Sequence, residues 1–223
     1  MEEKPMSEQE SLRVITEMIQ TAKGNFHEAG TSAILWGSVI GFCGIVTFAQ
    51  RYFSFSVGFD VWTLALIAII PQIWISIKER KRSVVKTYQE QALDAVWIVY
   101  AISISLLIIY FNVMPYATRM LMDQAGESLF YRSNGVTKQI NTFIPSYNSL
   151  LILIYGIPTL TTGLSRNFKP MIVGGIICYV FFTFSLFTDN TWDYLLNGLA
   201  GIINWLVPGL ILRKRYYAQR ASL

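Results

Sequence analysis

Six apolar segments whose interiors hold no Asp, Glu, Lys, Arg or His constrain the fold of this 223-residue chain more than any other feature. A bilayer core about 30 Å thick is crossed by a helix of about 20 mostly apolar residues, and the segments meet or approach this length. Continuous apolar runs indicate helices, since the strands of a membrane barrel alternate in polarity. We therefore predict an all-α polytopic membrane helix bundle with six transmembrane helices, at residues 32–50, 61–77, 95–113, 149–165, 171–188 and 194–212.

The overall composition agrees with a membrane location. Only 14% of the residues are charged and 53% are hydrophobic, whereas soluble domains carry about 25% charged residues. This balance excludes an ordinary soluble enzyme, and it also excludes a disordered chain. Met1–Glu10 holds four glutamates and one lysine, which is not the basic start of a cleavable signal peptide.

The basic residues predict the orientation, because cytoplasmic connections carry an excess of Lys and Arg. With both termini inside, 14 of the 18 basic residues lie on the cytoplasmic side. The prediction is therefore N-in and C-in. The basic groups beside the span ends can act as topology signals or as contacts for anionic lipids. We favour the topology signal and expect no nucleic-acid partner, because the longest basic run is short. These residues are Lys78, Arg80, Lys81, Arg82, Lys86, Arg213, Lys214 and Arg215.

Three segments are predicted to lie outside the bilayer. Residues 1–31 form a cytoplasmic segment with an amphipathic helix at Ser11–His27, which can pack on the bundle, lie on the membrane or pair with a partner helix. Packing on the bundle is favoured, because the apolar stripe is narrow. Residues 114–148 form an outer loop in which apolar residues at helical spacing predict a short interfacial helix near Ala117–Ala125. Residues 213–223 form a basic cytoplasmic tail.

The residue types needed for catalysis are nearly absent. His27 is the single histidine and has no second ligand at a suitable spacing. No nucleotide-binding, hydrolase or metalloprotease motif is present, and Cys43 and Cys178 lie in apolar runs. We therefore predict no catalytic residue, no cofactor and no metal site, and classify the chain as a non-enzymatic protein.

Three prolines interrupt three different spans, all in the predicted cytoplasmic half. Each frees a backbone carbonyl that must find a protein or water partner in the membrane. A neutral polar residue lies next to, or one turn from, each proline. These residues suggest a small cavity facing the cytoplasm, although kinks that only shape helix packing are the more common role of such prolines. The set is Pro71, Gln72, Pro158, Thr159, Asn204 and Pro208.

Glycines in the first, fifth and sixth predicted spans favour close helix packing. Gly37 and Gly41 form a G-x-x-x-G pattern, followed by Gly44. Such patterns allow two backbones to approach. In a six-span bundle, packing within one chain is the expected use.

Several short motifs occur in order along nearly the whole chain. They are Ile15, Met18, Ile19 and Ala22-Lys23; Leu35-Trp36-Gly37; Tyr155-Gly156-Ile157-Pro158 with Gly163; Lys169-Pro170-Met171-Ile172 before Gly174-Gly175; and Pro208-Gly209. Together they resemble a family of uncharacterised six-span membrane proteins from Bacteroidetes-type bacteria. The resemblance implies a multi-pass location in the bacterial inner (cytoplasmic) membrane. It supplies no catalytic residue, since the family has no established activity.

Two functional hypotheses remain from the sequence. The first is an interaction, scaffold or regulatory protein that contacts the lipid bilayer and a protein partner at the cytoplasmic face. The second is a small transporter or channel for a neutral or weakly polar solute, with the proline-lined cavity as its site. The substrate, the partner and the oligomeric state are not determined by the sequence.

Overall fold

The computed structural model describes residues 30–82, 88–139 and 147–221, and these are mostly helical. The predicted amphipathic helix at Ser11–His27 lies outside the described residues. The elements, in chain order, are α2 (Thr31–Tyr52), α3 (Thr63–Ile67), α4 (Ile69–Arg82), α5 (Tyr88–Ala125), β1 (Phe130–Ser133), β2 (Val136–Gln139), α6 (Tyr147–Ser165), α7 (Lys169–Ser185), α8 (Asn190–Gly201), the π-helical segment η1 (Ile202–Leu206) and α9 (Val207–Ala221).

Four helices in the described part of the chain are long and apolar enough to cross a membrane. They are α2, α5, α6 and the continuous helix that α8, η1 and α9 form over Asn190–Ala218. The helix α7 is also apolar but has 17 residues. The coarse prediction of a mostly helical protein with helices suited to a membrane is confirmed, with four such helices where six spans were predicted.

The segment predicted as the second span is divided into two helices. The short helix α3 ends at Ile67 and α4 begins at Ile69, so that Pro71 lies in the first turn of α4. Proline has no N–H and is tolerated in a first turn, whereas inside a helix it removes a bond to the carbonyl four residues earlier. The break just before Pro71 is therefore the local response to this residue.

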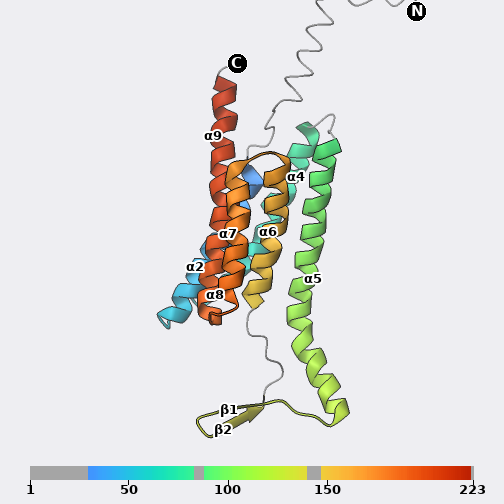
Figure 1. The fold of residues 1–223 in the computed structure, drawn as a ribbon, viewed down its shortest axis with the longest axis vertical. Helices are drawn as coiled ribbons and strands as arrows, with labels where there is room; N and C mark the ends of the chain where they lie inside the picture. The colour runs from blue at the N-terminus through green and yellow to red at the C-terminus, as the bar shows by residue number, and fades with distance from the viewer. Residues whose placement is uncertain (1–29, 83–87, 140–146, 222–223) are drawn as a thin grey trace, which may run out of the picture.

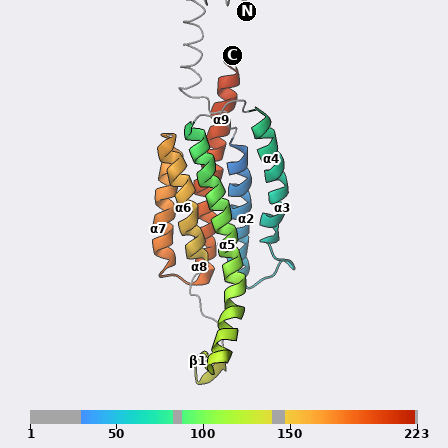
Figure 2. The same ribbon diagram turned by 90° about the vertical axis from the view of Figure 1, so that its right-hand side faces the viewer.

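The helices run alternately between the two ends of the bundle (Figures 1 and 2). The end of α4, the start of α5, the α6–α7 connection and the end of α9 lie at one end, which we call the basic end. The chain carries Lys78, Arg82, Arg166, Lys169 and Arg213–Arg215 in these segments. The α7–α8 connection lies at the opposite end, where α5 also extends beyond the bundle.

Glycines allow α2 to lie very close to α8 and η1. A Cβ atom on Gly44 would lie 2.5 Å from the Cα atom of Gly198, and one on Gly37 would overlap the backbone of Leu206. Only glycine permits two helix backbones to lie this near each other. The predicted use of the first-span glycines for packing within the chain is confirmed.

Polar and apolar side chains are distributed as in a membrane protein. On α5, the side chains of Ile98, Val99, Ile102 and Leu106 are exposed, and α5 buries only Leu93 against the described residues. Conversely, eight polar residues are buried inside the bundle: Asn148, Ser149, Thr159, Thr162, Ser185, Asp193, Asn197 and Asn204. Apolar surface outside and polar groups inside suit a lipid environment.

The described parts of the predicted outer loop and of the predicted tail contain regular structure. The helix α5 continues to Ala125 through the start of the predicted outer loop, with Pro115 inside it. The interfacial helix predicted near Ala117–Ala125 is therefore the last part of α5 and not a separate helix. The strands β1 and β2 then form an antiparallel hairpin. The predicted basic tail also continues α9 as far as Ala221.

Candidate functional site

Gln72 joins α4 to α2 through its carboxamide. The indole Nε1 of Trp36 donates to Gln72 Oε1 at 3.0 Å. Gln72 Nε2 donates to Ser32 Oγ and to Ser76 Oγ, both at 3.1 Å. The side chain is half-buried, and the neighbouring Pro71 is exposed. Gln72 therefore stabilises the contact between these two helices, which is the usual role of a neutral polar residue in a membrane span.

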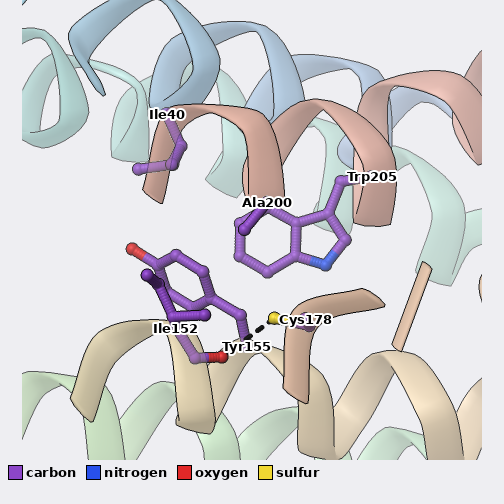
Figure 3. Close-up of a cluster of buried hydrophobic side chains, with 6 residues drawn as sticks. All are labelled: Ile40, Ile152, Tyr155, Cys178, Ala200 and Trp205. Carbon is purple, nitrogen blue, oxygen red and sulfur yellow. Dashed lines mark hydrogen bonds between the residues drawn. The ribbon is translucent and has the colours of Figure 1, made fainter. Parts of the chain in front are cut away.

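Thr159 and Pro158 lie on α6 and are completely buried. The Thr159 hydroxyl donates to the carbonyl of Tyr155 at 2.9 Å and accepts from Trp205 Nε1 at 3.0 Å. The ring of Trp205 also packs on that of Tyr155, with 4.8 Å between centroids. Figure 3 shows these two aromatic rings facing each other between α6 and η1. Thr159 is thus part of the packed centre of the bundle.

Asn204 and Pro208 lie on the last long helix and are also completely buried. Pro208 cannot donate a backbone hydrogen bond, and the helix before it widens into η1, where the Val207 N–H bonds to the Ile202 carbonyl. Neither the amide nitrogen nor the oxygen of Asn204 has a hydrogen-bond partner among the described residues. The facing Gly174 leaves room for this residue, since a Cβ there would lie 2.9 Å from Asn204 Oδ1.

The six residues predicted to line one cavity fall into two groups. Thr159 and Asn204 belong to the same region, because Trp205 follows Asn204 and bonds to Thr159. Gln72 instead bonds to Trp36 and Ser32 on α2 and to Ser76 on α4. The structure brings α6 and η1 into contact but gives no contact between α4 and α6.

The basic residues singled out in the sequence lie near the basic end. Lys78 Nζ lies 4.9 Å from the ring centroid of Trp74, and Arg80, Lys81 and Arg82 form the end of α4. Lys86 is outside the described residues. On α9, Arg213 lies over Tyr217 and Arg215 lies 5.3 Å from the centroid of the buried Phe168 ring, while Lys214 is exposed.

A second buried polar group, which the sequence reasoning missed, lies where the start of α6, the end of α7 and the start of α8 meet. Asn197 Nδ2 donates to Asn148 Oδ1 at 3.0 Å, and Asn148 Nδ2 donates to Asn190 Oδ1 at 3.1 Å. Together with Asp193, the residues Asn190 and Asn197 occupy one face of α8. Their i, i+3, i+7 spacing is a signal that was visible in the sequence.

This group, which we call the polar cluster, contains a carboxyl. Asp193 is completely buried and accepts a hydrogen bond from Thr188 Oγ1 at 2.6 Å. Ser185 Oγ donates to Ser149 Oγ at 2.7 Å, and both serines are buried. Five members of the polar cluster are buried, namely Asn148, Ser149, Ser185, Asp193 and Asn197, whereas Asn190 is half-buried and Thr188 is exposed. The carboxylate of Asp189 caps the N-terminus of α8 by accepting hydrogen bonds from the N–H groups of Thr191 and Trp192.

The two cysteines are buried in the packed bundle and have structural roles. Cys43 and Cys178 are buried, and their thiols donate to the carbonyls of Val61 and Ile152; the second bond is drawn in Figure 3. His27 lies outside the described residues. Comparisons with protein-family models, with curated proteins and with solved structures find no match to this chain.

Proposed function

We propose that the chain is a non-enzymatic, six-span protein of the bacterial inner membrane, with both termini in the cytoplasm, and that it acts by binding another protein. The alternating course of the helices supports six crossings, because α3 with α4 and the 17-residue α7 run between the same two ends as the longer helices. The basic side chains at one end support the orientation.

The observation that carries the interaction role is an arm at residues 112–139, made of the end of α5 and the β1–β2 hairpin. The last ring contact between α5 and the bundle joins Phe111 to Tyr147, with centroids 4.9 Å apart. The helix continues to Ala125, a distance of about 20 Å at 1.5 Å per residue. Among the described elements, β1 and β2 contact only each other.

The hairpin at the end of the arm exposes both apolar side chains and strand edges. Phe130, Tyr131 and Val136 are each more than half exposed. The turn at Asn134-Gly135 has positive φ at both residues, as a tight two-residue hairpin requires. An isolated two-stranded hairpin is marginally stable in water, and its open edges can pair with another chain. A protein partner on the side opposite the basic end would cover this surface.

The test places a photo-crosslinking amino acid at Tyr131 of the full chain in its native membrane. We expect a discrete crosslinked protein, and we expect Gly135→Val to abolish it, since φ near +79° is severely strained for a β-branched residue. Asn134→Gly is the matched control, because glycine accepts the same turn and should preserve the crosslink. An absence of any crosslinked protein, or a crosslink that survives Gly135→Val, would contradict the proposal.

One observation favours the second candidate function, a transporter or channel for a neutral or weakly polar solute. The buried carboxamide of Asn204 lies in a π-helical segment beside Pro208, close to the Cys178 thiol, and makes no hydrogen bond of ordinary geometry with the described residues. Segments of this type occur frequently at functional sites, and unpaired buried polar groups call for an explanation. Transport would require this region to open toward water, and the thiol-labelling experiment described in the Discussion separates the two functions.

A further inference from the structure

We infer that the hairpin at the end of the arm binds an acidic, extended segment of a partner protein, which pairs along the edge of β1 as a third strand. The inference rests on the proposed protein-binding function and adds to it the edge that is used and the conformation and charge of the bound segment. Three features of the hairpin carry it: the register of its strands, the side chains on its two edges and its charge.

The register of the hairpin determines which backbone groups point outward. Ser133 pairs with Val136 across the two-residue turn, and the next pair is Arg132 with Thr137. In such a hairpin the pair beside the turn exchanges backbone hydrogen bonds, and the following pairs alternate between bonded and non-bonded. The N–H and C=O groups of Arg132 therefore point away from β2, as do those of Phe130 two residues earlier. The same groups of Thr137 point outward from the edge of β2.

Both edges of the hairpin are open, and the hairpin lies apart from the helix bundle (Figure 1). Among the described elements, β1 and β2 contact only each other, and every residue of the two strands is exposed. Outward N–H and C=O groups along an edge are a template for an extended segment of another chain. The main-chain hydrogen bonds then give affinity, and the alternate side chains of the added strand give specificity.

The side chains favour the edge of β1 over that of β2. The rings of Phe130 and Tyr131 are 61% and 56% exposed. Because these residues are consecutive in a strand, one ring lies on each face of the hairpin. An added strand beside β1 would cover part of both rings. The strand β2 has one large apolar side chain, that of Val136, and its other three residues are polar, so pairing along β1 buries more apolar surface.

The charge of the hairpin selects the partner. From Ser128 to Asn148 the sequence holds two cations, Arg132 and Lys138, and no Asp or Glu. Both side chains are exposed. Lys138 pairs with Tyr131 and therefore lies on the face opposite to Arg132. Carboxylates on an added strand would lie beside these cations, and opposite charges on neighbouring strands are stabilising. The hairpin of a second copy would bring like charges together, which is destabilising.

The experiment uses the full chain purified in mild detergent and two short fluorescent peptides. One peptide alternates valine with glutamate and the other alternates valine with lysine, so that both favour an extended conformation and differ in charge. Binding is measured by fluorescence anisotropy. We expect saturable binding of the acidic peptide, with an affinity about tenfold or more above that of the basic peptide, since each charge beside the hairpin changes sign.

Two proline variants test the edge, because proline is tolerated in a strand where its missing N–H would face away from the ladder. Arg132→Pro removes an outward N–H of β1 and should abolish binding of the acidic peptide. Thr137→Pro is the matched control, since it removes an outward N–H of β2 and should leave the affinity within about twofold. Arg132→Gln keeps the N–H and removes the charge, and it should weaken binding about threefold.

The outcomes distinguish this inference from the proposed function. A protein crosslinked at residue 131, together with equal binding of the two peptides, would overturn the acidic strand and leave the protein-binding function intact. Unchanged peptide binding in Arg132→Pro, or binding lost in Thr137→Pro alone, would overturn the assignment of the β1 edge. A crosslinked product of twice the mass of the chain would identify a second copy as the occupant and overturn the inference. Absence of any crosslinked protein would overturn both.

Discussion

The indole nitrogen of Trp205 donates a 3.0 Å hydrogen bond to the hydroxyl of Thr159, and this bond links η1 to α6 at the centre of the bundle. The same hydroxyl donates to the carbonyl of Tyr155 at 2.9 Å, so it accepts and donates at once. A residue that the sequence marks only as a neutral polar group beside a proline is therefore a structural link between two helices.

We expect Thr159→Val to lower the free energy of unfolding by about 1 kcal/mol, because the shape is kept while the Trp205 N–H loses its acceptor in an apolar interior. Thr161→Val is the matched control: its exposed hydroxyl bonds only to the carbonyl of Ile157 in its own helix. Reversible unfolding in mixed detergent measures both variants. Equal decreases in the free energy of unfolding of the two variants would show that the Trp205–Thr159 bond contributes nothing to stability.

The contact between α2 and α8 predicts which of two glycine substitutions destabilises the protein more. Gly44→Ala should destabilise the protein by about 2 kcal/mol or more, since the new methyl group meets backbone atoms of Gly198 and Tyr194 that cannot turn aside. Gly41→Ala should cost less, because its methyl group meets mainly the side chain of Ile202. Thermal unfolding of the two variants checks the order. A smaller loss of stability for Gly44→Ala than for Gly41→Ala would be inconsistent with this packing.

The proposed topology predicts which thiols a membrane-impermeant maleimide reaches in intact cells. Phe59→Cys and Val136→Cys, both more than half exposed, should react without permeabilisation. Tyr217→Cys, at the basic end, should react only after the membrane is opened. Cys43 and Cys178 are buried and should give a low background. Labelling of Tyr217→Cys in intact cells would rule out a cytoplasmic C-terminus.

Thiol labelling also separates the two candidate functions. With the bundle closed as observed, Thr159→Cys and Asn204→Cys should be protected from a water-soluble reagent applied on the cytoplasmic side, because both positions are completely buried. Tyr217→Cys provides the reactive control on the same side. Rapid labelling of both core positions would show a water-filled opening, and it would favour transport over a purely interacting role.

The helical membrane fold could be predicted from the sequence because it depends on local composition. Long apolar runs without charges must form helices in a bilayer, whatever their neighbours are. The positions of most helices follow from this rule, and so does the close packing at Gly37 and Gly41. The hairpin was missed, although Asn134-Gly135 is a strong turn signal.

The candidate site was less predictable, because a linear pattern does not say which helix faces which. Gln72 and Thr159 look alike in the sequence, as neutral polar residues next to a proline. The tertiary structure pairs Gln72 with Trp36 on α2 and pairs Thr159 with Trp205 on η1.

Sequence alone thus determined that this chain is helical, suited to a membrane and poor in catalytic groups, since these properties are set by the residues within each segment. Only the tertiary structure decided that Asp193 is buried beside Asn197 and that the arm stands clear of the bundle. Burial depends on contacts between segments far apart in the chain. Asp193 lies near a helix end in the sequence and would be taken as solvated, whereas in the structure it is completely buried and bonded to Thr188.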